Sequence, residues 1–255
     1  MLEMTLERAY FHLCLVLGRL LRAGRYSKVR ITDHDGTLEV RKRRSLYAPL
    51  LISLGDLLVR LLDTGMRVLP QRKWQDRERL IYERLYAASI RIEADGTLVL
   101  PHLAGQTLAS VLEDPALGES ARKKAIELAV AALADFHARD FTHGDAMAEN
   151  VMVDLEAGVA RWFDFETVHD SGRPMTWRRA DDLRALIATS LLRTAAEDFR
   201  ETLQLVLDVY SDEGTTPLVA TSFVSVWQRP LAFHLGQAGL SFQSYREIGR
   251  LLTAR

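Results

Sequence analysis

Four residues in the middle of the chain have types and spacing that suit metal-assisted chemistry: His143, Asp145, Asn150 and Asp164. Two apolar, β-prone runs separated by a Gly-containing turn connect Asn150 to Asp164, and this pattern predicts a hairpin. The strands of a hairpin run antiparallel, so its two ends lie side by side. We therefore expect the Asn150 amide and the Asp164 carboxylate to converge at a point just beyond Asp145.

Such a group of oxygen donors suits Mg²⁺, which prefers oxygen ligands, keeps several waters and is shared with substrate phosphates. Phosphoryl transfer needs a metal to neutralise the phosphoryl oxygens and a carboxylate to orient the attacking hydroxyl and accept its proton. The cluster therefore predicts phosphoryl transfer. A metal-dependent hydrolase that uses His143 and the aspartates is a weaker interpretation, because the dense His and Asp spacing typical of such sites is not visible.

A second charged pair is expected closer to the N-terminus. The periodicity of residues 72–88 predicts a helix, and Glu78 falls in the middle of its apolar stripe. A carboxylate on an apolar face costs free energy unless a cation reaches it. A neighbouring strand ends in basic residues, so we expect Lys42 to be the partner, with Lys73 and the nearby arginines as alternatives. The pair has either a structural or a functional role.

The elements that would position these residues can be read from local patterns. Asp35-Gly36 and Asp95-Gly96 each separate alternating apolar residues, which predicts two β-hairpins. Residues 104–112 indicate a linker that enters helical sequence. The next helix is expected to begin with Ser120 as its N-cap and to lead into the loop that contains Asp145. Beyond Arg173 the chain indicates helices almost throughout.

The most hydrophobic run, residues 45–62, is broken by Asp56 and Arg60 and does not predict a transmembrane span. It predicts an amphipathic helix instead. The leading expectation is that its leucine face packs on the body of the protein. The alternative is an interfacial helix that lays the protein against a membrane with a lipid substrate, where the basic residues 41–44 would meet anionic headgroups. The leucines are Leu46, Leu50, Leu54, Leu57, Leu58, Leu61 and Leu62.

Composition sets the remaining limits. A chain of 255 residues, about half of them hydrophobic, can bury a substantial core without disulfides. The net charge of -1 gives no indication of a nucleic-acid partner. Cys14, the single cysteine, excludes a disulfide framework and a thiolate metal cluster, and it is expected to be a small buried hydrophobe. No secretory signal is evident, so we expect a cytoplasmic protein, with the inner membrane face as its peripheral location if the interfacial interpretation holds.

The His-Gly-Asp loop, with Asn150 five residues after Asp145 and Asp-Phe-Glu after a short hairpin, resembles the catalytic and metal-binding loops of the protein-kinase-like superfamily. Glu166 stands where protein kinases usually carry Gly. This form is similar to the aminoglycoside phosphotransferase, choline kinase and lipopolysaccharide (Kdo) kinase branches. The resemblance implies that Asp145 is the catalytic base, that Asn150 and Asp164 bind Mg²⁺, and that His143 orders the loop.

The same resemblance, which covers chiefly residues 98–191, assigns further parts. Lys42 and Glu78 would correspond to the pair that holds the ATP phosphates, and residues 99–103 to the adenine-binding hinge. Asp182, rather than Asp181, would be the aspartate that braces the backbone of the catalytic loop, whereas solvent exposure of both is the alternative. One expected part is missing, because no Gly-rich phosphate loop precedes Lys42.

The resemblance implies an α+β, two-lobed protein-kinase-like fold, with a small N-terminal lobe of antiparallel strands over residues 1–103 and a mostly helical C-terminal lobe over residues 104–255. The expected activity is ATP- and Mg²⁺-dependent phosphotransfer to a hydroxyl of a small molecule or a lipid-linked sugar. An atypical protein Ser/Thr kinase and a non-catalytic nucleotide-binding pseudokinase are the alternatives. In related small-molecule kinases the acceptor is lined by helices, and the candidates here are Trp227, Arg229, His234 and Gln237.

Overall fold

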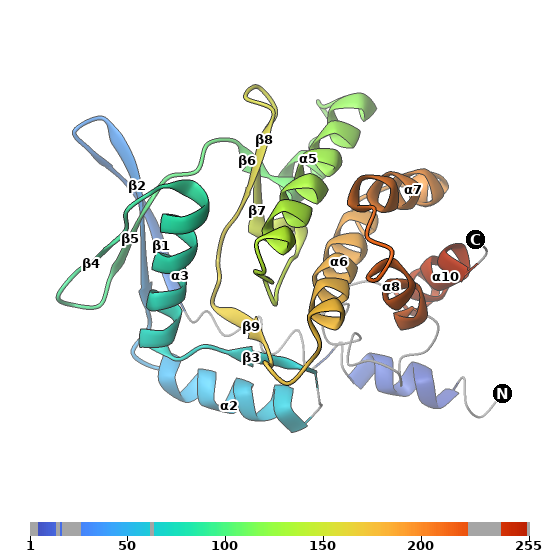
Figure 1. Ribbon diagram of the computed structural model, residues 1–255, viewed down its shortest axis with the longest axis horizontal. Coiled ribbons are helices and arrows are strands. Elements are labelled where there is room, and N and C mark those ends of the chain that lie inside the picture. Colours follow the sequence, from blue (N-terminus) through green and yellow to red (C-terminus); the bar gives the residue numbers. More distant parts are fainter. Residues whose placement is uncertain (1–4, 14–15, 17–26, 62–63, 224–240, 254–255) are drawn as a thin grey trace.

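The computed structural model describes residues 5–13, 16, 27–61, 64–223 and 241–253. The fold is α+β, with an antiparallel sheet in the N-terminal region and a helical C-terminal part (Figure 1). Six residues named above lie outside the described ones: Cys14, Leu62, Trp227, Arg229, His234 and Gln237.

The N-terminal sheet has four strands in the order β1-β2-β5-β4, and every pairing is antiparallel. Both predicted hairpins are present, and both turns use a glycine with positive φ, at Gly36 (79°) and Gly96 (80°). Glycine adopts this backbone region without the steric penalty of a Cβ. The strands are β1 (Ser27–His34), β2 (Thr37–Arg44), β4 (Arg91–Ile92) and β5 (Leu98–Pro101).

Helix α3 (Gln71–Tyr86) confirms the helix predicted over residues 72–88. Its buried stripe contains Trp74, Glu78, Ile81 and Tyr82, so the carboxylate does lie on the apolar face. The helix ends at Ala87, which adopts the left-handed conformation and donates its N–H to the Tyr82 carbonyl. Helix α3 therefore places the Glu78 side chain in the interior of the protein.

Helix α2 (Ala48–Leu61) is present, but the expectation that its leucine face packs on the body is wrong. The helix turns Ala48, Ile52 and Gly55 inward, and Asp56 forms an ion pair with Arg67 of β3 (Met66–Val68). Ala48 and Gly55 are small and let α2 approach the body closely, and the Asp56 carboxylate needs the Arg67 cation beside it. These residues therefore determine which face of α2 turns inward. The leucines at 46, 50, 54, 57 and 61 are exposed, whereas the side chain of Leu58 and all of Leu62 lie outside the described residues.

Strand β9 (Thr167–His169) pairs antiparallel with β3, a contact that the sequence did not predict. The pairing extends by two further backbone hydrogen bonds, from Leu69 N to Glu166 O at 2.9 Å and from Asp170 N to Gly65 O at 2.7 Å. These bonds tie the segment after Asp164 to the N-terminal part of the chain, beside α2 (Figure 1).

The middle of the chain forms a second antiparallel sheet in the order β6-β7-β8, so the hairpin predicted between Asn150 and Asp164 is present. Helix α5 delivers the chain to this region. Its N-cap is Gly118, not Ser120 as expected, because the helix begins at Glu119, two residues earlier than a Ser120 cap would place it. The elements are β6 (Gln106–Thr107), α4 (Leu108–Glu113), α5 (Glu119–Ala138), the 3₁₀ turn η1 (Ala148–Asn150), β7 (Val151–Asp154) and β8 (Val159–Trp162).

The C-terminal part is helical, as expected, and its apolar stripes join one core with α3, α4 and α5. Leu203, Tyr210, Tyr245 and Ile248 are among its buried residues. In the described part of the chain, no helix has both the length and the apolar character needed to cross a bilayer. The elements are α6 (Met175–Leu191), η2 (Ala196–Asp198), α7 (Phe199–Tyr210), α8 (Thr216–Ser222) and α10 (Phe242–Thr253).

Candidate functional site

Asp182 of α6 holds the backbone of the His-Gly-Asp loop. Its carboxylate accepts hydrogen bonds from His143 N at 2.6 Å and from Gly144 N at 2.8 Å, and it contacts His137 Nε2 at 3.0 Å. Burial by itself raises the pKa of Asp182, but the imidazoles of His169, His137 and His143 outweigh burial and lower it. The bracing expected of Asp182 is therefore present, and both aspartates, Asp181 and Asp182, are buried rather than solvent-exposed.

His143 links the loop to the hairpin. Its Nδ1 accepts a hydrogen bond from Asp145 N at 3.2 Å, so Nε2 carries the proton that it donates to the Phe163 carbonyl at 2.9 Å. Burial lowers the pKa of His143 to about 4, and the ring is neutral near pH 7. His143 thus orders the loop, because one ring nitrogen accepts from a backbone N–H and the other donates to a backbone carbonyl.

Asp145 and Asn150 are joined directly. The Asn150 amide donates to Asp145 Oδ2 at 3.0 Å and to the Asp145 carbonyl at 2.8 Å. Across the hairpin, Phe163 N donates to the Asn150 carbonyl at 3.0 Å, which places Asp164 next to Asn150. The two ends of the hairpin therefore lie side by side, as antiparallel pairing requires.

Asp164 has a left-handed backbone, with φ at 67°, a conformation that costs about 1 kcal/mol in a non-glycine residue. The cost is offset by an ion pair between its Oδ1 and Lys42 Nζ of β2, within hydrogen-bonding distance. Burial alone would lower the pKa of Lys42, but Asp164, Glu166 and Glu78 outweigh burial and raise it. Lys42 is therefore a buried, fully charged ammonium between two elements of the site.

The ion pair expected between Lys42 and Glu78 is not the one that forms. The Glu78 Oε1 atom instead accepts hydrogen bonds from Trp74 Nε1 at 3.0 Å and from Phe165 N at 3.2 Å. Several carboxylates compete for one ammonium, and Asp164 is the one that reaches it. Burial, with Lys42 opposing and Asp164 reinforcing it, raises the pKa of Glu78 to about 7. In the described part of the chain, Glu78 Oε2 has no hydrogen-bond partner.

Two charged residues of the site were missed by sequence reasoning: Glu166 and Arg44. The Glu166 Oε2 atom lies 3.6 Å from Lys42 Nζ and 3.7 Å from an Arg44 nitrogen. The Arg44 guanidinium stacks 4.6 Å from the centroid of Trp74, and Lys42 lies 5.1 Å from it. Alternation along a strand places Lys42 and Arg44 on one face, and this signal could have identified Arg44.

An apolar cavity of about 210 Å³ opens beside these charges. Lys42, Glu78 and Asp164 are its charged residues, and its remaining walls come from both sheets and from the residues predicted as the hinge. The two β1 side chains that line it, Val29 and Ile31, are more than half exposed, so a ligand in the cavity would cover them. The other lining residues are Val40, Tyr82, Leu100, Pro101, His102, Leu103, Met152 and Phe163.

The donor set fits a nucleotide with Mg²⁺. An apolar slot suits a purine ring, Lys42 suits phosphates, and Asn150 with Asp164 offers amide and carboxylate oxygens. Among the described residues, no group of three or more His, Cys, Asp or Glu side chains is arranged to hold a metal ion. A metal shared with phosphates needs only one or two protein carboxylates, so this finding does not bear on such a metal.

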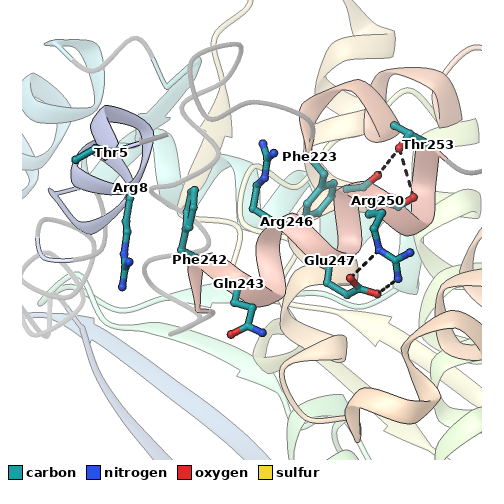
Figure 2. Close-up of a pocket in the computed structure, with 10 residues that line it drawn as sticks. Thr5, Arg8, Phe223, Phe242, Gln243, Arg246, Glu247, Arg250 and Thr253 are labelled. Carbon is teal, nitrogen blue, oxygen red and sulfur yellow. Dashed lines mark hydrogen bonds and ion pairs between the residues drawn. The ribbon is translucent and has the colours of Figure 1, made fainter. Parts of the chain in front are cut away.

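A second, more open hollow of about 770 Å³ lies between the N-terminal helical residues and α10 (Figure 2). Its charged side chains are largely paired: Arg250 with Glu247 at 2.5 Å, and Arg246 with Glu7 at 3.7 Å. None of the residues predicted to act in catalysis lines this hollow.

No protein-family model matches this chain, and the search of curated proteins found no match either.

Proposed function

We propose that the protein is an ATP-dependent phosphotransferase that moves the γ-phosphoryl group onto a hydroxyl of a small molecule or a lipid-linked sugar. One observation carries the proposal: Asn150 contacts Asp145 and lies beside Asp164, and Asp164 lines an apolar cavity together with Lys42. The proposed site therefore has a hydroxyl-orienting carboxylate, oxygen donors for Mg²⁺ and a cation for phosphates within one network.

In this proposal Asp145 orients the acceptor hydroxyl and takes its proton as the new O–P bond forms and the bond to the leaving ADP breaks. The Asn150 amide holds Asp145 Oδ2 at 3.0 Å and so fixes the direction of the carboxylate. Mg²⁺, when bound with the nucleotide, would neutralise phosphate charge at Asn150 and Asp164. Lys42 stays charged and exchanges its contact with Asp164 for the phosphate oxygens.

A small acceptor is favoured over a protein acceptor by the segment between Asp164 and α6. This segment is short, and part of it is paired in β9 with β3. Protein kinases of the usual type carry a long activation segment at this place, between the metal-binding loop and an Ala-Pro-Glu motif. An atypical protein kinase therefore remains the second candidate.

The first test is a thermal-shift titration with ATP, with and without Mg²⁺, because a ligand that binds only the folded state raises its apparent stability. We expect a Mg²⁺-dependent rise that is lost in Asp164→Ala and kept in Asp145→Ala. Asp145→Ala should then abolish transfer in a screen of sugars, amino alcohols and lipid-linked saccharides as acceptors. Full turnover by Asp145→Ala would refute the assignment of the base.

A non-catalytic nucleotide-binding protein is a further candidate, favoured by the turn between β1 and β2. That turn contains Asp35-Gly36 and no Gly-rich loop. Gly36 N donates a hydrogen bond to Asp33 Oδ1 at 2.8 Å, so this N–H is already paired. The titration together with the acceptor screen separates the two functions: a pseudokinase would give the thermal shift but would neither hydrolyse ATP nor transfer its phosphoryl group. Absence of any shift at millimolar ATP would contradict both.

A further inference from the structure

The outward side of helix α2 carries a continuous apolar stripe. Leu46 is 90% exposed and Leu50 and Leu61 are each 72% exposed, with Leu54 and Leu57 about half exposed between them. The spacing of three or four residues places the four leucines of α2 on one face of the helix, and Leu46 lies in the turn that precedes it. Isolated exposed leucines are ordinary on protein surfaces, but an aligned row of this kind indicates a contact with another apolar phase.

This stripe cannot turn inward, because the opposite face of α2 is already committed. Ala48 and Ile52 are buried against the body, and Asp56 Oδ1 lies 2.8 Å from Arg67 Nε of β3. Asp56 also pairs with Arg60, at 2.7 Å. Rotating the helix to bury the leucines would expose Ile52 and break the pair between Asp56 and Arg67. The exposed stripe is thus a consequence of how α2 docks.

We propose that this face of α2 binds the surface of an anionic lipid bilayer, with the helix axis parallel to the membrane plane. The leucines would enter the boundary between headgroups and acyl chains, as in other interfacial amphipathic helices. Tyr47, 75% exposed at the start of the helix, has the amphipathic ring that is favoured at this depth.

The charge on the border of the face selects the kind of partner. Arg60, in the last turn of α2, has a side chain that is 55% exposed, whereas Asp56, the acidic residue of α2, is turned toward β3 and pairs with both Arg60 and Arg67. Arg43 of β2, whose side chain is 54% exposed, pairs with Asp95. The exposed Arg72 and Lys73 begin α3, just beyond β3. Cations beside an apolar stripe complement anionic headgroups. A second copy packed symmetrically on this face would instead bring like charges together.

The proposal stands on exposure and charge, and it does not rest on phosphotransfer. Its geometry has a consequence for the candidate site nonetheless. Helix α2 contacts β3, and β3 pairs with β9, which follows directly after Asp164 and Glu166 (Figure 1). A bilayer under α2 would therefore lie on the side of the molecule where the segment after Asp164 runs, within reach of a lipid-linked acceptor.

The test measures co-sedimentation with phosphatidylcholine vesicles that contain phosphatidylglycerol, without nucleotide. Leu50→Gln/Leu54→Gln is expected to weaken partitioning about a hundredfold, because each inserted leucine contributes roughly tenfold. The matched control is Leu38→Gln/Leu80→Gln, which removes two exposed leucines outside α2 and should leave partitioning unchanged. Both pairs are at the surface, and thermal unfolding checks that both variants fold. Equal partitioning of the two double variants would overturn the proposal.

A fluorophore identifies what covers the face. In a Cys14→Ser background, Leu50→Cys is labelled with an environment-sensitive dye, and Leu38→Cys is the control. We expect a blue shift at position 50 only when the anionic vesicles are added, reduced by high salt. A blue shift in buffer that rises with protein concentration would show a second copy on the face. A blue shift in buffer at every concentration would show that the chain covers it. Either result would overturn the proposal.

Discussion

Glu78 and Asp182 are both fully buried carboxylates of the same site, and burial alone raises the pKa of each, yet their pKa values shift in opposite directions. The pKa of Glu78 is raised to about 7, whereas the pKa of Asp182 is lowered. The difference lies in the donors around them. The imidazoles of His169, His137 and His143 lower the pKa of Asp182, which also accepts from two backbone N–H groups. Glu78 has both of its hydrogen bonds on Oε1 and none on Oε2 among the described residues.

One part of the site therefore has its hydrogen bonds satisfied in the free chain, and the other part does not. The loop that Asp182 holds has its hydrogen bonds in place in the free chain. Near Glu78, by contrast, Lys42 forms its ion pair with Asp164, and an apolar cavity adjoins these three charged residues. We expect ligand binding to leave the Asp182 network unchanged and to redistribute the partners of Lys42.

The largest expected effect is that of Asp182→Ala. The change leaves His143 N and Gly144 N buried without an acceptor, and each such group costs roughly 1–3 kcal/mol. Loss of the partner of His137 adds to this, so we expect a loss of about 3–5 kcal/mol in the free energy of unfolding, measured by urea denaturation. A loss below 1 kcal/mol would show that the loop does not depend on Asp182.

Glu78→Gln tests the other half of the comparison through pH. Unfolded Glu78 ionises near pH 4.5 and folded Glu78 near pH 7, so the folded state binds more protons between these values. Stability from this group is present below pH 4.5 and is lost as the pH rises to 7. We expect the stability of Glu78→Gln, relative to the parent protein, to rise by up to about 3 kcal/mol across this range. A difference that is independent of pH would refute the raised pKa.

His143→Gln is the control with the opposite sign. The pKa of His143 falls from 6.5 to about 4 on folding, so its stability contribution is present above pH 6.5 and is lost as the pH falls toward 4. The variant should therefore gain stability relative to the parent protein as the pH falls, while Glu78→Gln gains as the pH rises. The same slope in both variants would contradict the two assignments.

The smallest expected effect comes from Gly144→Ala. Gly144 has φ at 83°, and a Cβ there would meet the Val168 Cα at 2.8 Å, so the loop or β9 must shift. Gly158→Ala is the matched control, since φ is also positive (66°) but nothing lies within 4 Å of a Cβ. We expect about 1 kcal/mol of destabilisation at Gly158 and about 2–3 kcal/mol at Gly144, by thermal unfolding. Equal losses would show that the contact with β9 relaxes freely.

Local patterns were enough to predict much of the fold and of the loop. Asp-Gly turns between alternating residues gave both N-terminal hairpins, and helical periodicity placed Glu78 on the buried face of α3. Antiparallel pairing likewise brought Asn150 next to Asp164. These features depend on neighbours in sequence, so periodicity and turn chemistry are sufficient to find them.

Contacts between distant segments were the ones that the sequence did not predict. The pairing of β3 with β9 joins short strands about a hundred residues apart, and strand propensity does not name a partner. Lys42 forms its ion pair with Asp164 and not with Glu78, and this depends on the distances between β2, α3 and the segment after β8. For α2, the sequence showed an amphipathic helix but not which face would dock, because Asp56 finds Arg67 only in the folded chain.

The pairing of β3 with β9 also bears on control of the protein. Thr167 is held in the ladder opposite Val68, so a modification that reorganised this segment would first have to unzip two strands. The His-Gly-Asp loop is likewise held by Asp182 in the free chain. For the proposed phosphotransferase, we therefore expect the rate to follow the supply of ATP and acceptor rather than a covalent switch in this segment.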